Sequence, residues 1–205
     1  MIVAKTSVRV VYNPPEKDVD FSKIKFHPHW MPSLCTQKKP FGKKLYQVYE
    51  EVTTGRREVI QTDAVIQGIE REQDSIDIVN SKFGTMFQKN TTRFTNDWYT
   101  GEPDIIDAPN DLIIDIKTSG SPEAFDNLTW SSFTRYLPQG IAYCDLLEYS
   151  IFEVIFVNLT GNKIKKMTFN ITPEMIQAQR RRVEFMRGVM RGWNDPQSLD
   201  KIKRI

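Results

Sequence analysis

The chain has 205 residues, of which 40% are hydrophobic, and its formal net charge at pH 7 is +2. This length and hydrophobic content predict one domain with a buried core. No apolar run approaches the ~18 residues of a membrane-spanning helix, and the first residues do not resemble a signal peptide. The two cysteines are too few to hold an iron–sulfur cluster within this chain. We therefore expect a cytoplasmic protein with reduced thiols.

Charge is distributed unevenly along the chain. Residues 1–60 contain 11 Lys or Arg and 6 Asp or Glu, residues 61–160 contain 6 and 16, and residues 161–205 contain 11 and 4. An acidic middle between basic ends is typical of a cation-binding site beneath a surface that binds phosphates. Ordinary solvated surface charge explains the same distribution equally well, so this pattern alone does not decide.

The first third of the chain contains few clear elements. The predicted elements are a strand near residues 8–12, a helix over 45–52 after a basic turn at 38–44, and a longer helix over 63–83. Gly84 is the expected C-cap of the longer helix. We interpret residues 1–60 as a mostly helical or irregular extension of a single domain that covers residues 1–205.

Strands and helices alternate in the remainder. The predicted strands lie near residues 85–90, 92–96, 102–106, 112–117, 150–158 and 163–171. A helical segment in two pieces is predicted over residues 122–148, and a final helix should begin at Pro173, with Thr172 as N-cap, and reach about Trp193. This order predicts an α/β fold in which helices flank a central mixed β-sheet.

The segment Leu112–Thr118 carries the strongest chemical signal. Side chains alternate between the two faces of a strand, so Asp115 and Lys117 share one face. A hairpin would bring Asp104, on the preceding strand, alongside Asp115, where like charges repel unless a cation bridges them. A divalent metal ion with a bound water would use this arrangement. Taken alone, an Asp-x-Lys triplet also fits an ordinary edge strand with polar residues outward.

Two further groups of residues can complete such a site. The long predicted helix offers four acids as a third carboxylate: Glu70, Glu72, Asp74 and Asp77. On a later helix, Gln139 and Tyr143 are four residues apart and share a face. Each group alone fits a solvated or half-buried helix surface.

In combination these residues resemble the motifs of PD-(D/E)XK nucleases, in the branch with lambda exonuclease, YqaJ-type phage exonucleases and RecB nuclease domains. The matching motifs, in chain order, are Gly68-x-x-x-Glu72, Gly101-Glu102-Pro103-Asp104, Asp115-Ile116-Lys117 and Gln139-x-x-x-Tyr143. They span about a third of the chain. The resemblance selects Glu72 rather than Glu70 and implies a restriction-endonuclease-like fold.

The resemblance also implies roles for individual residues. The implied catalytic residues are Glu72, Asp104, Asp115, Lys117, Gln139 and Tyr143. Two Mg²⁺ or Mn²⁺ ions would be held by Glu72, Asp104, Asp115 and the backbone carbonyl of Ile116. Lys117 would orient or deprotonate the attacking water, and Gln139 and Tyr143 would orient the lysine or contact the DNA backbone.

Basic residues outside the motifs are candidates for contacts with DNA phosphates. The predicted nucleic-acid-binding residues are Lys43, Lys44, Arg135 and Gln139, with Lys38, Lys39, Arg56 and Arg57 as further candidates. Each of these Lys and Arg residues also fits a role as a solubilising surface group.

These features predict a metal-dependent DNA exonuclease of phage recombination or replication. Polarity from 5′ to 3′ on duplex ends, a single-strand annealing protein as partner and a homo-oligomeric state follow from the resemblance alone. Two alternatives remain open: a structure-specific or restriction-type endonuclease with the same site, and a non-catalytic DNA-binding protein on a nuclease fold. The intact set of acids and lysine argues against the non-catalytic alternative.

Overall fold

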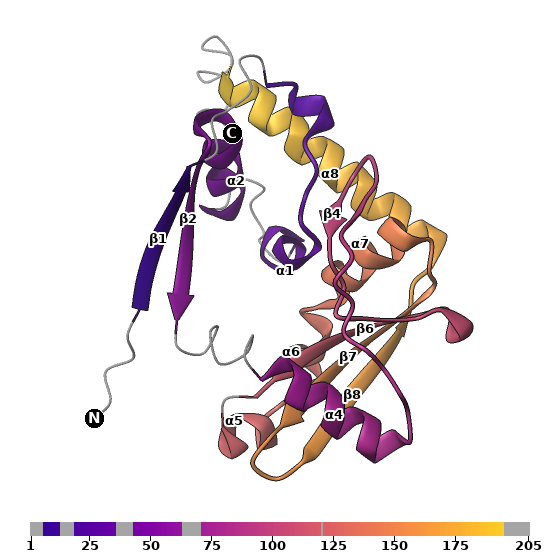
Figure 1. Cartoon of the computed structure of the whole chain (residues 1–205). Coiled ribbons are helices and arrows are strands. Elements are labelled where there is room, and N and C mark those ends of the chain that lie inside the picture. The colour runs from indigo at the N-terminus through magenta and orange to yellow at the C-terminus, as the bar shows by residue number, and fades with distance from the viewer. Residues whose placement is uncertain (1–5, 13–18, 36–42, 63–70, 120, 195–205) are drawn as a thin grey trace.

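A computed structural model describes residues 6–12, 19–35, 43–62, 71–119 and 121–194 (Figure 1). Of residues 6–12, 56–62 and 194 it describes the backbone alone. The N-terminal part of the predicted helix over 63–83, with Gly68 and Glu70, lies outside the described residues, as do Lys38 and Lys39.

Four strands form the central sheet. Their order is β5 (Ile105–Asp107), β6 (Leu112–Thr118), β7 (Ile151–Asn158) and β8 (Lys163–Asn170). β6 runs antiparallel to β5 and parallel to β7, and β7 runs antiparallel to β8. A parallel pair needs a long crossover, which is supplied by α5 (Pro122–Asp126), α6 (Trp130–Thr134) and α7 (Leu137–Leu147). The prediction of a mixed sheet flanked by helices is confirmed.

Helices cover both faces of this sheet (Figure 1). On one face, Ile113 of β6 packs in the same apolar cluster as Ala142 of α7, and α8 (Pro173–Asn194) lies against α7. On the other face, Ile114 of β6 packs with Ile76 of α4 (Glu72–Phe83). Successive residues of β6 therefore enter different cores, which is the alternation that its sequence predicts.

The N-terminal part adds helices and a separate two-stranded ladder. Its elements are β1 (Thr6–Tyr12), η1 (Phe21–Lys23), η2 (Pro28–Trp30), α1 (Met31–Cys35), α2 (Lys43–Thr54) and β2 (Arg56–Thr62). β1 pairs with β2 rather than with the central sheet, and the strand at β2 was not predicted. η2 and α1 pack against α7, so this part of the chain adjoins the helix that carries Gln139 and Tyr143.

Three predicted strands differ from the structure. The strand expected at residues 85–90 is absent, because the side chain of Asn80 hydrogen-bonds both backbone groups of Phe87. It accepts from the Phe87 N–H at 2.8 Å and donates to the Phe87 carbonyl at 2.9 Å. The strands expected at 92–96 and 102–106 shorten to β3 (Phe94–Thr95), which pairs with β4 (Thr100–Gly101), and to β5.

The helical segments agree more closely. The segment predicted as two pieces over 122–148 forms three helices, α5 to α7. The final helix begins at Pro173 as predicted, with the Thr172 hydroxyl 3.4 Å from the N–H of Met175. Among the described residues, no helix has the length and apolarity needed to cross a bilayer.

Candidate active site

The β5–β6 hairpin brings the two strand acids together. Ile105 pairs with Ile114 in this ladder, so Asp104, one residue before β5, lies opposite Asp115. Oδ2 of Asp104 accepts a 2.7 Å hydrogen bond from the backbone N–H of Ile116. The carboxylate of Asp104 is therefore held directly against β6.

Burial gives this pair of acids an unusual charge state. Asp115 is 1% exposed. Burial, reinforced by repulsion from Asp115, raises the pKa of Asp104 to about 7. Burial also raises the pKa of Asp115, although the Lys117 ammonium opposes that shift. Two opposed carboxylates in this environment favour a bound cation over two free negative charges.

Lys117 is the cation that the chain itself supplies. Its Nζ lies 2.7 Å from Oδ2 of Asp115 and 5.0 Å from the centre of the Tyr136 ring. Burial alone would lower the pKa of Lys117, but the carboxylates of Asp115 and Asp104 outweigh burial and raise it. Lys117 is therefore an ammonium at neutral pH, which suits positioning a phosphate or a water more than accepting a proton.

One face of α7 holds both halves of the hairpin. The side-chain amide of Gln139 donates a 2.7 Å hydrogen bond to Oδ1 of Asp115. One turn later, the Tyr143 hydroxyl donates a 2.9 Å hydrogen bond to the backbone carbonyl of Glu102, two residues before Asp104. Burial raises the pKa of Tyr143, so its hydroxyl stays protonated and able to donate. Gln139 therefore holds the Asp115 carboxylate, and Tyr143 holds the chain just before Asp104. The described hydrogen bonds of these two side chains do not include Lys117.

Gly140 lets α7 approach the sheet this closely. A Cβ at this position would lie 2.0 Å from the ring of Phe152 on β7. Only hydrogen fits between the helix backbone and that ring. The neighbouring Gln139 therefore reaches Asp115 because residue 140 has no side chain.

Glu72 approaches from the opposite face of the sheet. It is the first residue of α4, and its Oε2 forms a 2.7 Å ion pair with Lys89. After burial, which is the largest cause, the charge of Glu72 also raises the pKa of Asp104 and Asp115. The buried hydroxyl of Ser75 lies 2.9 Å from that of Thr118, which ties the first turn of α4 to the end of β6.

The donor set fits a divalent cation in part. Among the described residues, no three His, Cys, Asp or Glu side chains converge as a metal-binding group. The two aspartates nevertheless offer hard oxygen donors, and the described partner of the buried Oδ2 of Asp115 is the Lys117 ammonium at 2.7 Å. A bound Mg²⁺ or Mn²⁺ would take this oxygen as a ligand in place of the ammonium. Glu72 and the Ile116 carbonyl remain predicted ligands.

The predicted DNA-binding residues lie in two places. Arg135 is exposed and stacks 5.2 Å from the centre of the Tyr136 ring, which also contacts Lys117. Lys43 and Lys44 begin α2, and Nζ of Lys44 lies 4.8 Å above the Trp30 ring, so no described contact links them to the acids. The side chains of Arg56 and Arg57 lie outside the description.

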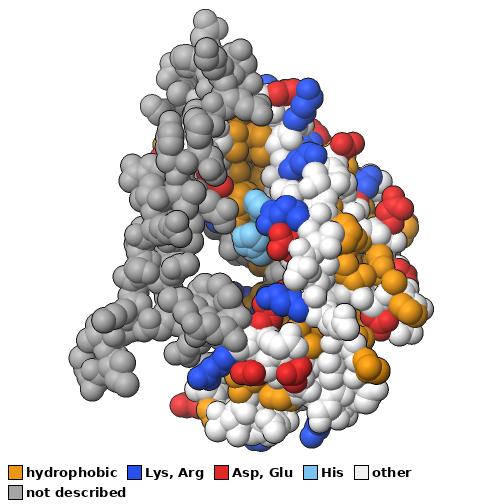
Figure 2. Space-filling model, viewed as in Figure 1, with side chains coloured by type: hydrophobic (Ala, Val, Ile, Leu, Met, Phe, Trp, Pro, Cys, Tyr) orange, Lys and Arg blue, Asp and Glu red, His pale blue; other side chains and the backbone are white. Residues whose placement is uncertain are grey.

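Figure 2 shows acidic and basic side chains interspersed on the viewed face, with the histidine side chains near its centre. These are His27 and His29, whose rings lie 5.3 Å apart and border Trp30. Electrostatic attraction of DNA on this face would therefore depend on local pairs of residues.

Several residues of the site had no signal in the sequence. Tyr136 joins Lys117 to Arg135, Lys89 pairs with Glu72, and the Ser75–Thr118 contact joins two elements. None of these belongs to a recognisable motif. Their proximity follows from packing between α4, α6, α7 and β6, which local spacing does not encode.

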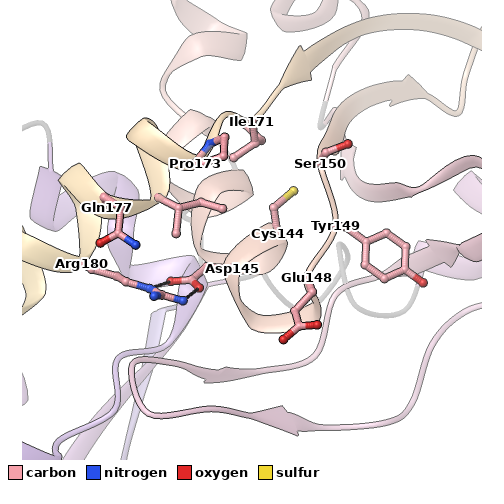
Figure 3. Close-up of a pocket in the computed structure, with 10 residues that line it drawn as sticks. Cys144, Asp145, Glu148, Tyr149, Ser150, Ile171, Pro173, Gln177 and Arg180 are labelled. Carbon is pink, nitrogen blue, oxygen red and sulfur yellow. Dashed lines mark hydrogen bonds and ion pairs between the residues drawn. The ribbon is translucent and has the colours of Figure 1, made fainter.

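A cavity of about 350 Å³ lies at the other end of α7 (Figure 3). Cys144, Ile171 and Ile176 line it, and the Arg180–Asp145 ion pair, with Nε 2.9 Å from Oδ2, forms part of its wall. Burial raises the pKa of Cys144 to about 12, so its thiol is unreactive at neutral pH. None of the predicted site residues lines this cavity.

Two solved exonucleases are similar in fold to this chain. A phage-related exonuclease from Haemophilus somnus 129PT matches with a TM-score of 0.70 and 17% identity, over 82% of this chain and 94% of that one. An alkaline exonuclease from Laribacter hongkongensis matches with a TM-score of 0.68 and 12% identity, over 88% and 95%. The same Laribacter protein in complex with dAMP matches with a TM-score of 0.67. No protein-family model and no curated sequence matches the chain.

Proposed function

We propose that this chain is a metal-dependent deoxyribonuclease that removes nucleotides from DNA ends. The observation that carries the proposal is the pair of half-buried Asp104 and buried Asp115, with Lys117 beside it. This constellation lies on a fold that the chain shares with two exonucleases. The complex of the Laribacter protein with dAMP supports a deoxynucleotide as ligand of this chain.

The chain's own residues would divide the work as follows. Asp104 and Asp115 would hold Mg²⁺ or Mn²⁺, which when bound lowers the pKa of a coordinated water and neutralises charge on the phosphate. The Lys117 ammonium would hold a nonbridging phosphate oxygen or orient the water. Gln139 would keep the Asp115 carboxylate in place, and Tyr143 would fix the chain just before Asp104.

The finer assignments are part of the same proposal. Phage recombination or replication as the setting, 5′-to-3′ polarity, a second metal ion at Glu72, an annealing protein as partner and a homo-oligomer all derive from the lambda-type resemblance. The structural relatives support the exonuclease class. The endonuclease alternative uses the same site and differs in whether a DNA end is needed.

Cleavage of end-labelled linear duplex and of closed circular DNA, each with Mg²⁺ and with EDTA, tests the proposal. We expect mononucleotides from the linear substrate, no cutting of the circle, and no product in EDTA. Asp115→Asn and Lys117→Met should reduce release by about a hundred- to a thousandfold, the scale of losing a central electrostatic group. Asp126→Asn, a change at an exposed acid of α5, is the control. Cutting of the circle would establish the endonuclease instead.

A further inference from the structure

Lys89 is a positively charged residue of the site that no motif includes. It lies in the segment between α4 and β3, and its Nζ is 2.7 Å from Oε2 of Glu72. The two side chains are 39% and 18% exposed, so the ammonium reaches solvent and does not lie in a core. An ion pair this exposed stabilises a fold by only about 0–1 kcal/mol.

The backbone around Lys89 is fixed without that ion pair. On one side, the Asn80 side chain holds both backbone groups of Phe87. On the other side, the N–H of Asn90 donates a 2.7 Å hydrogen bond to the carbonyl of Asp104, and its side-chain amide donates to Pro103 at 3.0 Å. Lys89 is therefore presented from a segment that is anchored to α4 and to the Asp104 strand, and its ion pair is not needed to hold the segment.

The charges of the site suggest what the ammonium is for. The site contains three carboxyl groups, those of Glu72, Asp104 and Asp115. It contains two ammonium groups, those of Lys89 and Lys117. If a divalent cation binds the carboxylates, Glu72 has less need of Lys89 as a partner. The Lys89 ammonium then lies beside the bound cation, and a DNA phosphate can take the place of the Glu72 carboxylate as its anionic partner.

We propose that Lys89 is a DNA-phosphate-binding residue, which exchanges Glu72 for a nonbridging oxygen of the backbone when a divalent cation and DNA bind together. This inference rests on the proposed function, since it takes DNA as the ligand. It assigns Lys89 a direct contact with the substrate. The competing account is that Lys89 merely keeps Glu72 in position.

Two properties separate these accounts. A direct phosphate contact releases a condensed counterion. Loss of the contact therefore makes the negative slope of log affinity against log salt concentration shallower by about 1. A contact that works only through Glu72 has no effect once Glu72 carries no charge. The test therefore combines a salt series with a double-mutant cycle.

The experiment measures binding of a short duplex to the full chain by fluorescence anisotropy, with Ca²⁺ in place of Mg²⁺ and the DNA checked for integrity. We expect Lys89→Gln to weaken DNA binding about tenfold and to make the negative salt slope shallower by about 1. The same loss should appear in a Glu72→Gln background. Lys82→Gln, at the exposed C-terminal end of α4, is the matched control and should leave both values unchanged.

Calorimetry with Mg²⁺ alone completes the test. Because Lys89 competes with the metal for Glu72, Lys89→Gln should bind Mg²⁺ at least as tightly as the unmodified chain. Weaker Mg²⁺ binding, an unchanged salt slope, or an effect on DNA that vanishes in the Glu72→Gln background would each overturn the inference. If the unmodified chain neither binds DNA nor releases nucleotides from it, the proposed function fails first, and that result is distinct.

Discussion

The amide of Gln139 on α7 and the carboxylate of Asp115 on β6 are joined by a 2.7 Å hydrogen bond between two buried side chains. Lys117 approaches the other carboxylate oxygen of Asp115 at 2.7 Å. The orientation of this acid is thus set from two sides before any ligand binds. A group held in this way can meet a metal or a phosphate without reorganising.

Replacing Gln139 by Leu should destabilise the protein and weaken its metal site. The substitution leaves a buried carboxylate without its neutral donor, which costs about 1–3 kcal/mol. Urea denaturation in EDTA at pH 8 measures the loss, and calorimetry with Mg²⁺ should show weaker binding. Gln73→Leu is the control, because Gln73 forms the same kind of bond to Asp77 at 2.9 Å on an exposed face of α4. Equal losses in the two variants would contradict the assigned role of Gln139.

Asp104 should make the metal-free protein less stable as pH rises. Its folded pKa is about 7, raised by burial and by Asp115, whereas an unfolded aspartate titrates near about 3.9. Between these values the folded state holds the proton more tightly, so stability falls from about pH 4 to pH 7. Asp104→Asn removes this fall, because a neutral amide does not ionise.

The predicted difference can be measured by thermal unfolding in EDTA. At pH 8 Asp104→Asn should be more stable than the unmodified protein by about 1–3 kcal/mol, and at pH 4 the two should nearly coincide. Mg²⁺ should restore stability to the unmodified protein at pH 8 and have little effect on the variant. A variant that is less stable at pH 8 in EDTA would show that the raised pKa is wrong.

The sequence predicted the parts of this fold that follow from short-range patterns. The alternation in Leu112–Thr118 predicted a strand with Asp115 and Lys117 on one face, and Thr172-Pro173 predicted the start of the last helix. It failed at residues 85–90, where the side chain of Asn80 hydrogen-bonds both backbone groups of Phe87 and no strand forms. β2 was likewise missed, since its partner β1 lies far away in sequence.

The same distinction applies to the candidate site. Motif spacing selected the strand acids, the lysine and the α7 pair as candidates, because these residues lie on one hairpin and one helix. Contacts such as Ser75 with Thr118 arise between elements that are 43 residues apart, and local spacing does not predict them. The spatial roles of Lys89 and Tyr136 were unpredictable for the same reason.

Ser75 should control the position of Glu72. Its hydroxyl is fully buried and lies 2.9 Å from that of Thr118, and it is one turn after Glu72 on α4. Ser75→Ala leaves the Thr118 hydroxyl without this partner and should cost about 1–2 kcal/mol in denaturation experiments. Because the first turn of α4 loses its tie to β6, Mg²⁺ affinity should fall as well. A stability loss with unchanged Mg²⁺ affinity would separate Ser75 from the metal site.

Gly140 should tolerate substitution less well than Gly188, another glycine of the described helices. Ala at this position would place its Cβ 2.0 Å from the Phe152 ring, so α7 must move away from β7. Overpacking of this kind costs about 1–3 kcal/mol, and the shift would carry Gln139 away from Asp115. We therefore expect Gly140→Ala to lower both the free energy of unfolding and the affinity for Mg²⁺.

Gly188→Ala on α8 is the matched control for this change. A Cβ there meets nothing within 4 Å, and Ala in a helix is favoured over Gly by about 0.5–1 kcal/mol, so this variant should be slightly more stable. Phe152→Leu in the Gly140→Ala background should recover part of the loss, since a smaller side chain gives the new methyl group room. If Gly140→Ala keeps full stability and Mg²⁺ affinity, then the close contact of α7 with β7 does not position Gln139.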